Sequence, residues 1–247
     1  MPGHEVPVLL VAGTIVFAGH LVKGVSGFGS ALFAVPALLL FLDVKFVTPV
    51  FLILDFASGT LLVTSNWRSV DRRLLLLLLS GMVVGTSIGT WLLVSVSHDI
   101  LKRVLGVLVT GWALAMLLER EPHAPISGRS LGSALAPVSG FLGGALGATF
   151  SVNGPPIIIY LSHVLEDKRV FRATLYGVFF VDACYKMVLF TANGLLNWDI
   201  LRFAALMVPF LIAGVAAGSR LQRLLDRRSF RRVVAGILAV TGVMLLI

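Results

Sequence analysis

The chain has 247 residues, of which 57% are apolar and only 13% are charged, and its mean hydropathy is +0.98. A soluble domain is about 45–50% apolar and about 25% charged, so this composition excludes a soluble enzyme, a disordered chain and a nucleic-acid-binding domain of ordinary build. The net charge of +8 fits a membrane protein, because Lys and Arg accumulate in cytoplasmic loops. We therefore expect an all-α polytopic membrane protein that is surrounded by lipids and has no nucleic-acid partner.

Ten apolar runs follow one another along the chain. They lie at about 6–23, 28–42, 46–64, 74–97, 101–118, 131–150, 154–165, 172–192, 201–219 and 233–247. A spanning helix needs roughly 20 residues to cross about 30 Å of hydrocarbon. The fourth, eighth and ninth runs meet this length easily. The second and seventh runs are too short to cross, and we expect them to be half-helices. The first run is expected to remain in the mature protein, because residues 1–5 lack the basic start of a signal peptide.

The distribution of Lys and Arg predicts the orientation of the chain. Gaps that follow odd-numbered runs hold fifteen of these residues, including six arginines between 220 and 232, whereas gaps that follow even-numbered runs hold four. Because Lys and Arg favour the cytoplasmic side, we expect the odd-numbered gaps in the cytoplasm and both termini outside.

Landmark residues of the first half recur in the second half. Gly24, Gly27 and Pro36 recur 120 positions later as Gly144, Gly147 and Pro156, Asp55 recurs 127 later as Asp182, and Gly85 and Gly89 recur 129 later as Gly214 and Gly218. We therefore expect a first transmembrane repeat over 1–118, a linker over 119–130 and a second repeat over 131–247. Five runs is an odd number, so the second repeat would be inverted, as in secondary transporters.

Each repeat opens with an apolar run, a glycine-rich break and a short apolar run. The breaks span 23–30 and 147–156. Backbone that leaves a helix at membrane depth must be buried in protein or line a watery cavity. Each run–break–run is therefore expected to form a hairpin, which either spans the membrane twice or is re-entrant with its tip near the midplane.

The residues of the two breaks indicate an anion site. We expect Asn153 to cap a short helix that has Pro155 in its first turn, and Ser26 to cap a helix that begins near Phe28. The start of each short helix would carry unpaired N–H groups and a partial positive charge. Two such ends that meet from opposite sides would bind an anion near the midplane. In an alternative interpretation the glycines are close-packing contacts and the prolines are kinks.

Three strongly charged residues lie within the apolar runs: Asp55, Asp182 and Lys186. Such residues are costly in a membrane and are functional by default. Asp182 and Lys186 are four positions apart and can neutralise each other on one helix, or Lys186 can face the anion. Asp55 has no such neighbour, and desolvation would favour its protonated form, which makes it a candidate proton carrier.

The break motifs resemble those of a known family. Gly24-x-Ser-Gly-Phe-Gly29 followed by Pro36, then Asn153-Gly-Pro-Pro156 and Lys168-Arg-x-Phe-Arg-Ala-Thr174, are similar to the sulfite exporter TauE/SafE family of bacterial anion transporters. The likeness runs through nearly the whole chain. It implies transport of sulfite, thiosulfate or an organosulfonate, as export across the inner membrane and coupled to protons.

Together these arguments predict a set of site residues. The expected substrate-binding residues are Gly24, Ser26, Gly27, Phe28, Gly29, Thr149, Ser151, Asn153, Gly154, Pro155 and Lys186, and the proton-coupling candidates are Asp55 and Asp182. The resemblance carries the family motif onto those of them that lie between Gly24 and Gly29 and between Asn153 and Pro155, and also onto Pro36 and Pro156.

Other functions fit the sequence less well. It contains no phosphate loop, no His-Glu-x-x-His and no Cys/His metal spacing, so we expect no catalytic residue, cofactor or metal. A passive anion channel would share the helix-end site but would need no titratable relay. A membrane scaffold would not need paired polar breaks. The many small residues allow a homo-oligomer but do not require one.

Overall fold

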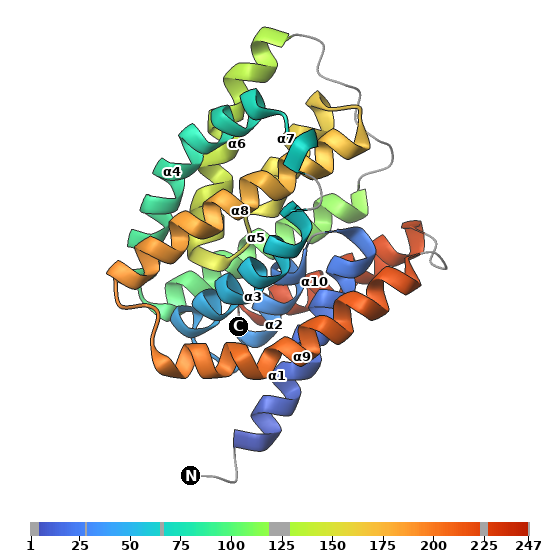
Figure 1. Ribbon diagram of the computed structural model, residues 1–247. Coiled ribbons are helices and arrows are strands. Elements are labelled where there is room, and N and C mark those ends of the chain that lie inside the picture. The colour runs from blue at the N-terminus through green and yellow to red at the C-terminus, as the bar shows by residue number, and fades with distance from the viewer. Residues whose placement is uncertain (1–4, 28, 65–66, 119–128, 223–226, 247) are drawn as a thin grey trace. The chain divides into compact units, whose positions relative to one another are not determined.

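A computed structural model describes residues 5–27, 29–64, 67–118, 129–222 and 227–246 (Figure 1). In these ranges the chain forms ten α-helices and one short 3-10 helix, and no strand. The helices are α1 (Glu5–Ser26), α2 (Ser30–Leu38), α3 (Val44–Thr64), α4 (Arg72–Ser95), α5 (His98–Leu118), α6 (Arg129–Phe150), α7 (Gly154–Val164), α8 (Lys168–Ala192), α9 (Trp198–Leu221) and α10 (Arg227–Met244), with the 3-10 helix η1 at Trp67–Ser69. The all-α fold is confirmed, and each apolar run corresponds to one α-helix.

Helix length separates spanning helices from half-helices. Within the described residues, α1, α4, α8 and α9 are long and apolar enough to cross a membrane. The second and seventh runs form the two shortest α-helices, with 9 and 11 residues. At a rise of 1.5 Å per residue these reach roughly 14 and 17 Å, well short of the hydrocarbon thickness.

The helices form two compact units, each of which draws on both halves of the sequence. Unit 1 comprises residues 1–50, 96–120 and 198–247, and unit 2 comprises 51–95 and 121–197. Unit 1 therefore contains α1, α2, α5, α9 and α10, and unit 2 contains α4, α6, α7 and α8, while α3 crosses the boundary. The predicted linker lies outside the described residues except for Arg129 and Ser130, which begin α6.

Each short helix folds back along the long helix that precedes it. In unit 1, a Cβ atom added to Gly19 would lie 2.8 Å from both the Ser30 carbonyl oxygen and the Ala34 Cβ. In unit 2, the Ser139 hydroxyl donates a hydrogen bond of 2.8 Å to the Pro156 carbonyl. The chain thus forms the helical hairpins α1–α2 and α6–α7.

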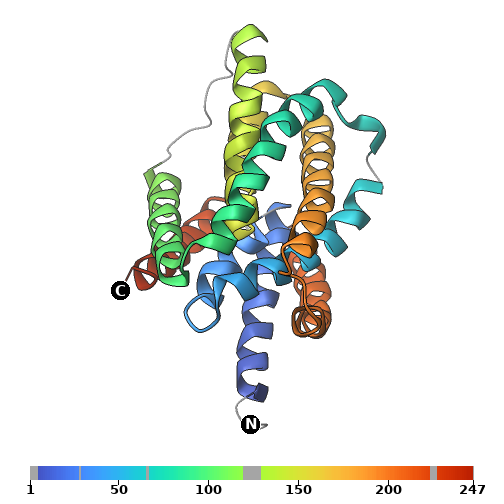
Figure 2. The same ribbon diagram turned by 90° about the vertical axis from the view of Figure 1, so that its left-hand side faces the viewer.

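Glycines bring a long helix of each unit into backbone contact with the first arm of the hairpin. In unit 2, Gly85 and Gly89 of α4 face the backbone of Phe141 and Ala145 on α6, and the helices run parallel (Figure 2). A larger side chain at either glycine would overlap a carbonyl oxygen. Buried backbone can approach this closely only where one helix lacks Cβ atoms.

The same kind of contact joins α9 to α1 in unit 1. Gly214 faces the Phe17 carbonyl, and Gly218 faces the Leu21 carbonyl. These are the positions that the sequence repeat aligns with Gly85 and Gly89. The internal repeat itself stays a prediction, but its aligned glycines perform the same packing role in both units.

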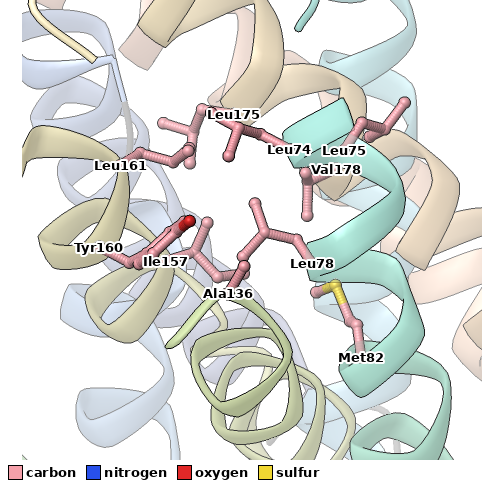
Figure 3. Packing of buried hydrophobic residues seen from close by; sticks show 10 residues of the cluster. All are labelled: Leu74, Leu75, Leu78, Met82, Ala136, Ile157, Tyr160, Leu161, Leu175 and Val178. Atoms are coloured by element: carbon pink, nitrogen blue, oxygen red, sulfur yellow. The ribbon is translucent and has the colours of Figure 1, made fainter. Parts of the chain in front are cut away.

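One hydrophobic cluster holds the helices of unit 2 together (Figure 3). It contains side chains from α4, α6, α7 and α8, namely Leu74, Leu75, Leu78, Met82, Ala136, Ile157, Tyr160, Leu161, Leu175 and Val178. Tyr160, which lies near the second break in sequence, belongs to this cluster and is 6% exposed. The cluster fixes the position of α7 against α4 and α8, and therefore the position of the break that precedes it.

The glycine contact in unit 2 can be tested by adding one methyl group. We expect Gly85→Ala to lower the free energy of unfolding by about 1–3 kcal/mol, as overpacking does, because its Cβ would overlap the Phe141 carbonyl. Gly111→Ala on α5 is the matched control, since a Cβ there meets nothing within 4 Å. Thermal unfolding in detergent measures both variants, and equal melting temperatures would contradict the contact.

Candidate functional site

The second break is a three-residue turn between α6 and α7. It comprises Ser151, Val152 and Asn153, and Ser151 has a positive φ of 58°. The amide groups of Ser151 and Val152 donate to the carbonyls of Gly147 and Leu146, at 2.9 and 3.4 Å. The chain therefore reverses within unit 2 while its backbone stays hydrogen-bonded, as a buried break requires.

The start of α7 presents few N–H groups. The first four N–H positions of a helix have no partner within it, and here these are Asn153, Gly154, Pro155 and Pro156. Proline carries no N–H, so only Asn153 and Gly154 can donate at this end. The partial positive charge of the helix start is present, but an anion would need a further donor.

Asn153 does not cap α7 with its side chain, and this expectation was wrong. Its backbone is already helical, with φ −82° and ψ −16°, and the side chain makes no capping hydrogen bond. A capping side chain normally extends from a residue in the β region. The Asn153 amide instead points to α8, where its Nδ2 lies 3.5 Å from Asp182 Oδ2, a long contact.

Asp182 and Lys186 form the buried ion pair that their spacing predicts. The Lys186 Nζ lies 2.8 Å from Asp182 Oδ2, and the two residues are only 5% and 2% exposed. Charges buried this deeply persist only when they are paired. The pair gives this part of unit 2 one cation and one anion with no net charge.

Thr86 on α4 completes the coordination of the carboxylate, and the sequence analysis missed it. Its hydroxyl donates to Asp182 Oδ1 at 2.7 Å, and the residue is fully buried. One turn further along α8, the hydroxyls of Tyr185 and Ser87 lie 2.9 Å apart. The signal was the group of hydroxyl residues Thr86, Ser87 and Thr90, which lie together in an otherwise apolar stretch of α4.

The cation of the pair lies beside the break. A Cβ added to Gly147 would come 2.7 Å from the Asn153 Cβ and 3.4 Å from the Lys186 Nζ. The Lys186 ammonium is therefore close to the last turn of α6, whose carbonyl groups carry a partial negative charge. The structure thus brings together Asn153, Asp182 and Lys186, three of the predicted residues.

Other predicted residues of the second break have structural roles. The Thr149 hydroxyl lies 2.8 Å from the Ala145 carbonyl and 3.1 Å from that of Gly89, so it ties α6 to α4. Gly154 and Pro155 form the first turn of α7. Asp55, the second proton-coupling candidate, lies half-buried on α3.

The first break is shorter than expected, because α1 continues through Ser26. The Ser26 hydroxyl donates to the Val22 carbonyl of its own helix at 2.7 Å, and α2 begins only at Ser30. Ser26 is therefore not the cap of α2, and that expectation was wrong. A hydroxyl inside a helix bonds readily to the carbonyl four residues earlier.

The glycines of the first break differ in their roles. Gly27 and Gly29 have φ values of 88° and 92°, which only glycine adopts without strain. A Cβ on Gly24 would come 2.7 Å from the Val215 carbonyl, so Gly24 is a packing contact with α9, as the alternative interpretation proposed. Phe28 lies outside the described residues.

The site in unit 2 gathers several hydrogen-bond donors around one buried carboxylate. The donors are an ammonium, an amide, a hydroxyl and a helix start, and the Asp182 carboxylate is the acceptor among them. Among the residues that the structure describes, no three His, Cys, Asp or Glu side chains come close enough to hold a metal ion.

Comparison with known proteins identifies relatives over most of the chain. The sequence model of the family described as "Sulfite exporter TauE/SafE" matches residues 11–245. A protein of Comamonas testosteroni named "Probable inner membrane transporter protein TsaS" is 28% identical over 197 residues, which are 78% of this chain and 80% of that protein. A protein of Cupriavidus necator named "Probable sulfite/organosulfonate exporter TauE" is 25% identical over 244 residues, which are 97% of this chain and 94% of that protein. No solved structure matches the chain significantly.

The buried pair can be tested by changing its members one at a time and together. Asp182→Asn is expected to lower the free energy of unfolding by about 3–5 kcal/mol, because it leaves the Lys186 charge buried without a partner. The neutral double variant Asp182→Asn/Lys186→Met should recover most of that loss, since two neutral side chains need no compensation.

Chemical unfolding of the single and double variants in detergent measures this coupling as a double-mutant cycle. Glu166→Gln, which changes an exposed carboxylate just before the same helix, is the matched control and should change stability little. Additive losses in the double variant would show that the two charges do not compensate each other.

Proposed function

This chain belongs to the sulfite exporter TauE/SafE family, and is therefore a multi-pass membrane transporter of anions and not an enzyme; we propose that it exports a small sulfur-containing anion. The anion would be sulfite, thiosulfate or an organosulfonate, moved as a secondary transporter and coupled to protons.

The observation that carries this proposal is the buried Lys186 beside the α6–α7 break. An ammonium that is 5% exposed within a spanning helix marks a functional site by default. The α7 start adds a partial positive charge and two N–H groups at the same break. The Lys186 ammonium and the start of α7 are both suited to binding a compact oxyanion. Neither of them would recognise a nucleotide base.

The relatives support the choice of substrate. The Cupriavidus necator protein is named a probable sulfite/organosulfonate exporter, and the match to it covers 97% of this chain. Sulfonate and sulfite groups present several oxygen acceptors on one sulfur atom, which matches a set of converging donors. The relative's name and the hydrogen-bond donors of the site together support a sulfur-containing anion as the substrate.

The predicted inverted repeat is part of the proposal. Gly27–Gly29 in unit 1 and Ser151–Asn153 in unit 2 each precede a short helix, and α2 begins with a full set of N–H groups because no proline lies in its first turn. The aligned glycine contacts of α4 and α9 support the repeat. We propose that two opposed helix starts bind the anion near the midplane, and that rocking of the two repeats gives it alternating access to the two sides of the membrane.

The distribution of basic residues supports an orientation in the inner membrane with both termini outside. Fifteen Lys and Arg fall in the gaps assigned to the cytoplasm. The Comamonas testosteroni relative is named an inner membrane transporter. Asp182 and Asp55 are the two candidates for the proton-carrying group.

Transport can be measured with purified protein in liposomes. We expect saturable flux of at least one of sulfite, thiosulfate and ethanesulfonate, faster than that of sulfate or chloride, and larger when a pH gradient is imposed. Lys186→Met should lower this flux about tenfold or more, because a charge-assisted hydrogen bond contributes about 1.5–3 kcal/mol.

Lys168→Met is the matched control, since Lys168 is an exposed lysine at the start of the same helix and should leave the flux unchanged. Flux that ignores the pH gradient would indicate a passive channel in place of a coupled transporter. No response to any sulfur anion would contradict the proposal.

A further inference from the structure

We infer that Asp182 is an internal competitor of the transported anion: its carboxylate occupies the Lys186 ammonium until it is protonated, and the anion then takes its place. This inference rests on the proposed function and assigns the coupling of proton and anion to one residue pair. It selects Asp182 over Asp55 as the group that carries the proton.

The geometry of the carboxylate divides its two oxygens between different partners. Oδ2 faces the cation, with Lys186 Nζ at 2.8 Å and Asn153 Nδ2 at 3.5 Å. Oδ1 accepts the hydroxyl of Thr86 at 2.7 Å. The oxygen that holds the cation is therefore also the one that lies toward the break, where a ligand would arrive.

Protonation of Oδ2 can release the cation without disturbing Thr86. A protonated carboxyl keeps one oxygen as an acceptor and gains one O–H donor. Oδ1 can go on accepting from Thr86, while the new O–H no longer attracts the Lys186 ammonium. The buried Thr86 hydroxyl thus keeps its partner in both states, so the exchange does not cost this hydrogen bond.

Charge balance requires the two events to occur together. The pair is now neutral, with one carboxylate and one ammonium, and both residues are at least 95% buried. An anion that arrived alone would leave a net negative charge in a buried site, and a proton that arrived alone would leave a net positive one, and both are costly. A monoanion and one proton restore neutrality, and this predicts a stoichiometry of roughly one to one.

Polar groups from α4, the break, α6 and α8 itself face the pair. From α4 the facing group is the Thr86 hydroxyl, from the break it is the Asn153 amide, and from α6 it is the backbone at Gly147. On α8 itself the neighbouring titratable group is the Tyr185 phenol, which is paired with Ser87. On α3, Phe56 stacks against Phe180 of α8 and Asp55 precedes it, so Asp55 is the competing carboxylate that an experiment must distinguish.

The direct test counts protons during anion binding. Purified protein in weakly buffered detergent solution is mixed with ethanesulfonate, a monoanion that does not titrate near neutral pH, and a pH indicator follows the solution. We expect uptake of roughly one proton per anion bound, and a dissociation constant that rises about tenfold per pH unit in the linked range. Anion binding without proton uptake would overturn the inference and leave the proposed function standing.

Variants locate the proton. Asp182→Asn should still bind the anion but take up no proton, and its affinity should not depend on pH. Tyr185→Phe, which removes the neighbouring α4–α8 hydrogen bond without changing a charge, is the matched control and should take up as many protons as the wild type. Proton uptake that persists in Asp182→Asn and disappears in Asp55→Asn would overturn the assignment.

A stability measurement keeps the test informative if Asp182→Asn folds poorly. In that variant Lys186 has lost its carboxylate, so a bound anion should restore the pairing. Ethanesulfonate should therefore raise the melting temperature of Asp182→Asn more than that of the wild type, and should not raise that of Asp182→Asn/Lys186→Met. An equal rise in all three proteins would overturn the inference, and absence of any anion binding by the wild type would overturn the proposed function with it.

Discussion

The close approach of α4 to α6 is the constraint on which the site in unit 2 depends. It exists because α4 has no side chain at positions 81, 85 and 89, where the backbone of α6 would otherwise be obstructed. Backbone contact at this range sets the register of the two helices, and Thr86 follows directly after one of these glycines. The same spacing that allows packing therefore aims a hydroxyl at Asp182 on α8. Packing and polar recognition are two results of one glycine pattern.

The buried charges impose the second requirement. A lone carboxylate or ammonium inside a membrane protein would be strongly unfavourable, whereas a hydrogen-bonded pair is tolerated. The pair is not an efficient way to stabilise a helix bundle, because apolar residues of similar size would do as well. Its place beside a break of the backbone supports the proposal that the charges are kept for an interaction with an anion, since an ammonium and a helix start both attract negative charge.

Much of the fold could be predicted from the sequence, because it follows from hydrophobic patterning. Run lengths and glycine positions predict the ten helices, the shortness of two of them and the break after Phe150. Helical periodicity predicts the Asp182–Lys186 pair. The two caps could not be predicted correctly. Whether Ser26 ends a helix or begins one depends on how far α1 continues, and the orientation of Asn153 depends on a carboxylate 29 residues away. Thr86 was missed for the same reason, since its partner lies on a helix of the other half of the sequence.

The two breaks are alike in form but differ in the charged residues of their repeats, and this difference suggests different roles for them in the proposed mechanism. In the alignment of the repeats, Asp182 corresponds to Asp55, and the position four residues later is Lys186 in the second repeat but Gly59 in the first. The break in unit 2 also has two prolines at the start of its short helix, which remove N–H donors, whereas the break in unit 1 keeps all of them. The start of α7 thus has fewer N–H donors than that of α2, and the full positive charge of Lys186 compensates for the missing donors. Because that charge is held by a carboxylate that can be protonated, the proposed mechanism assigns attraction of the anion and control by the proton to the second repeat, and backbone donors that no proton can switch to the first.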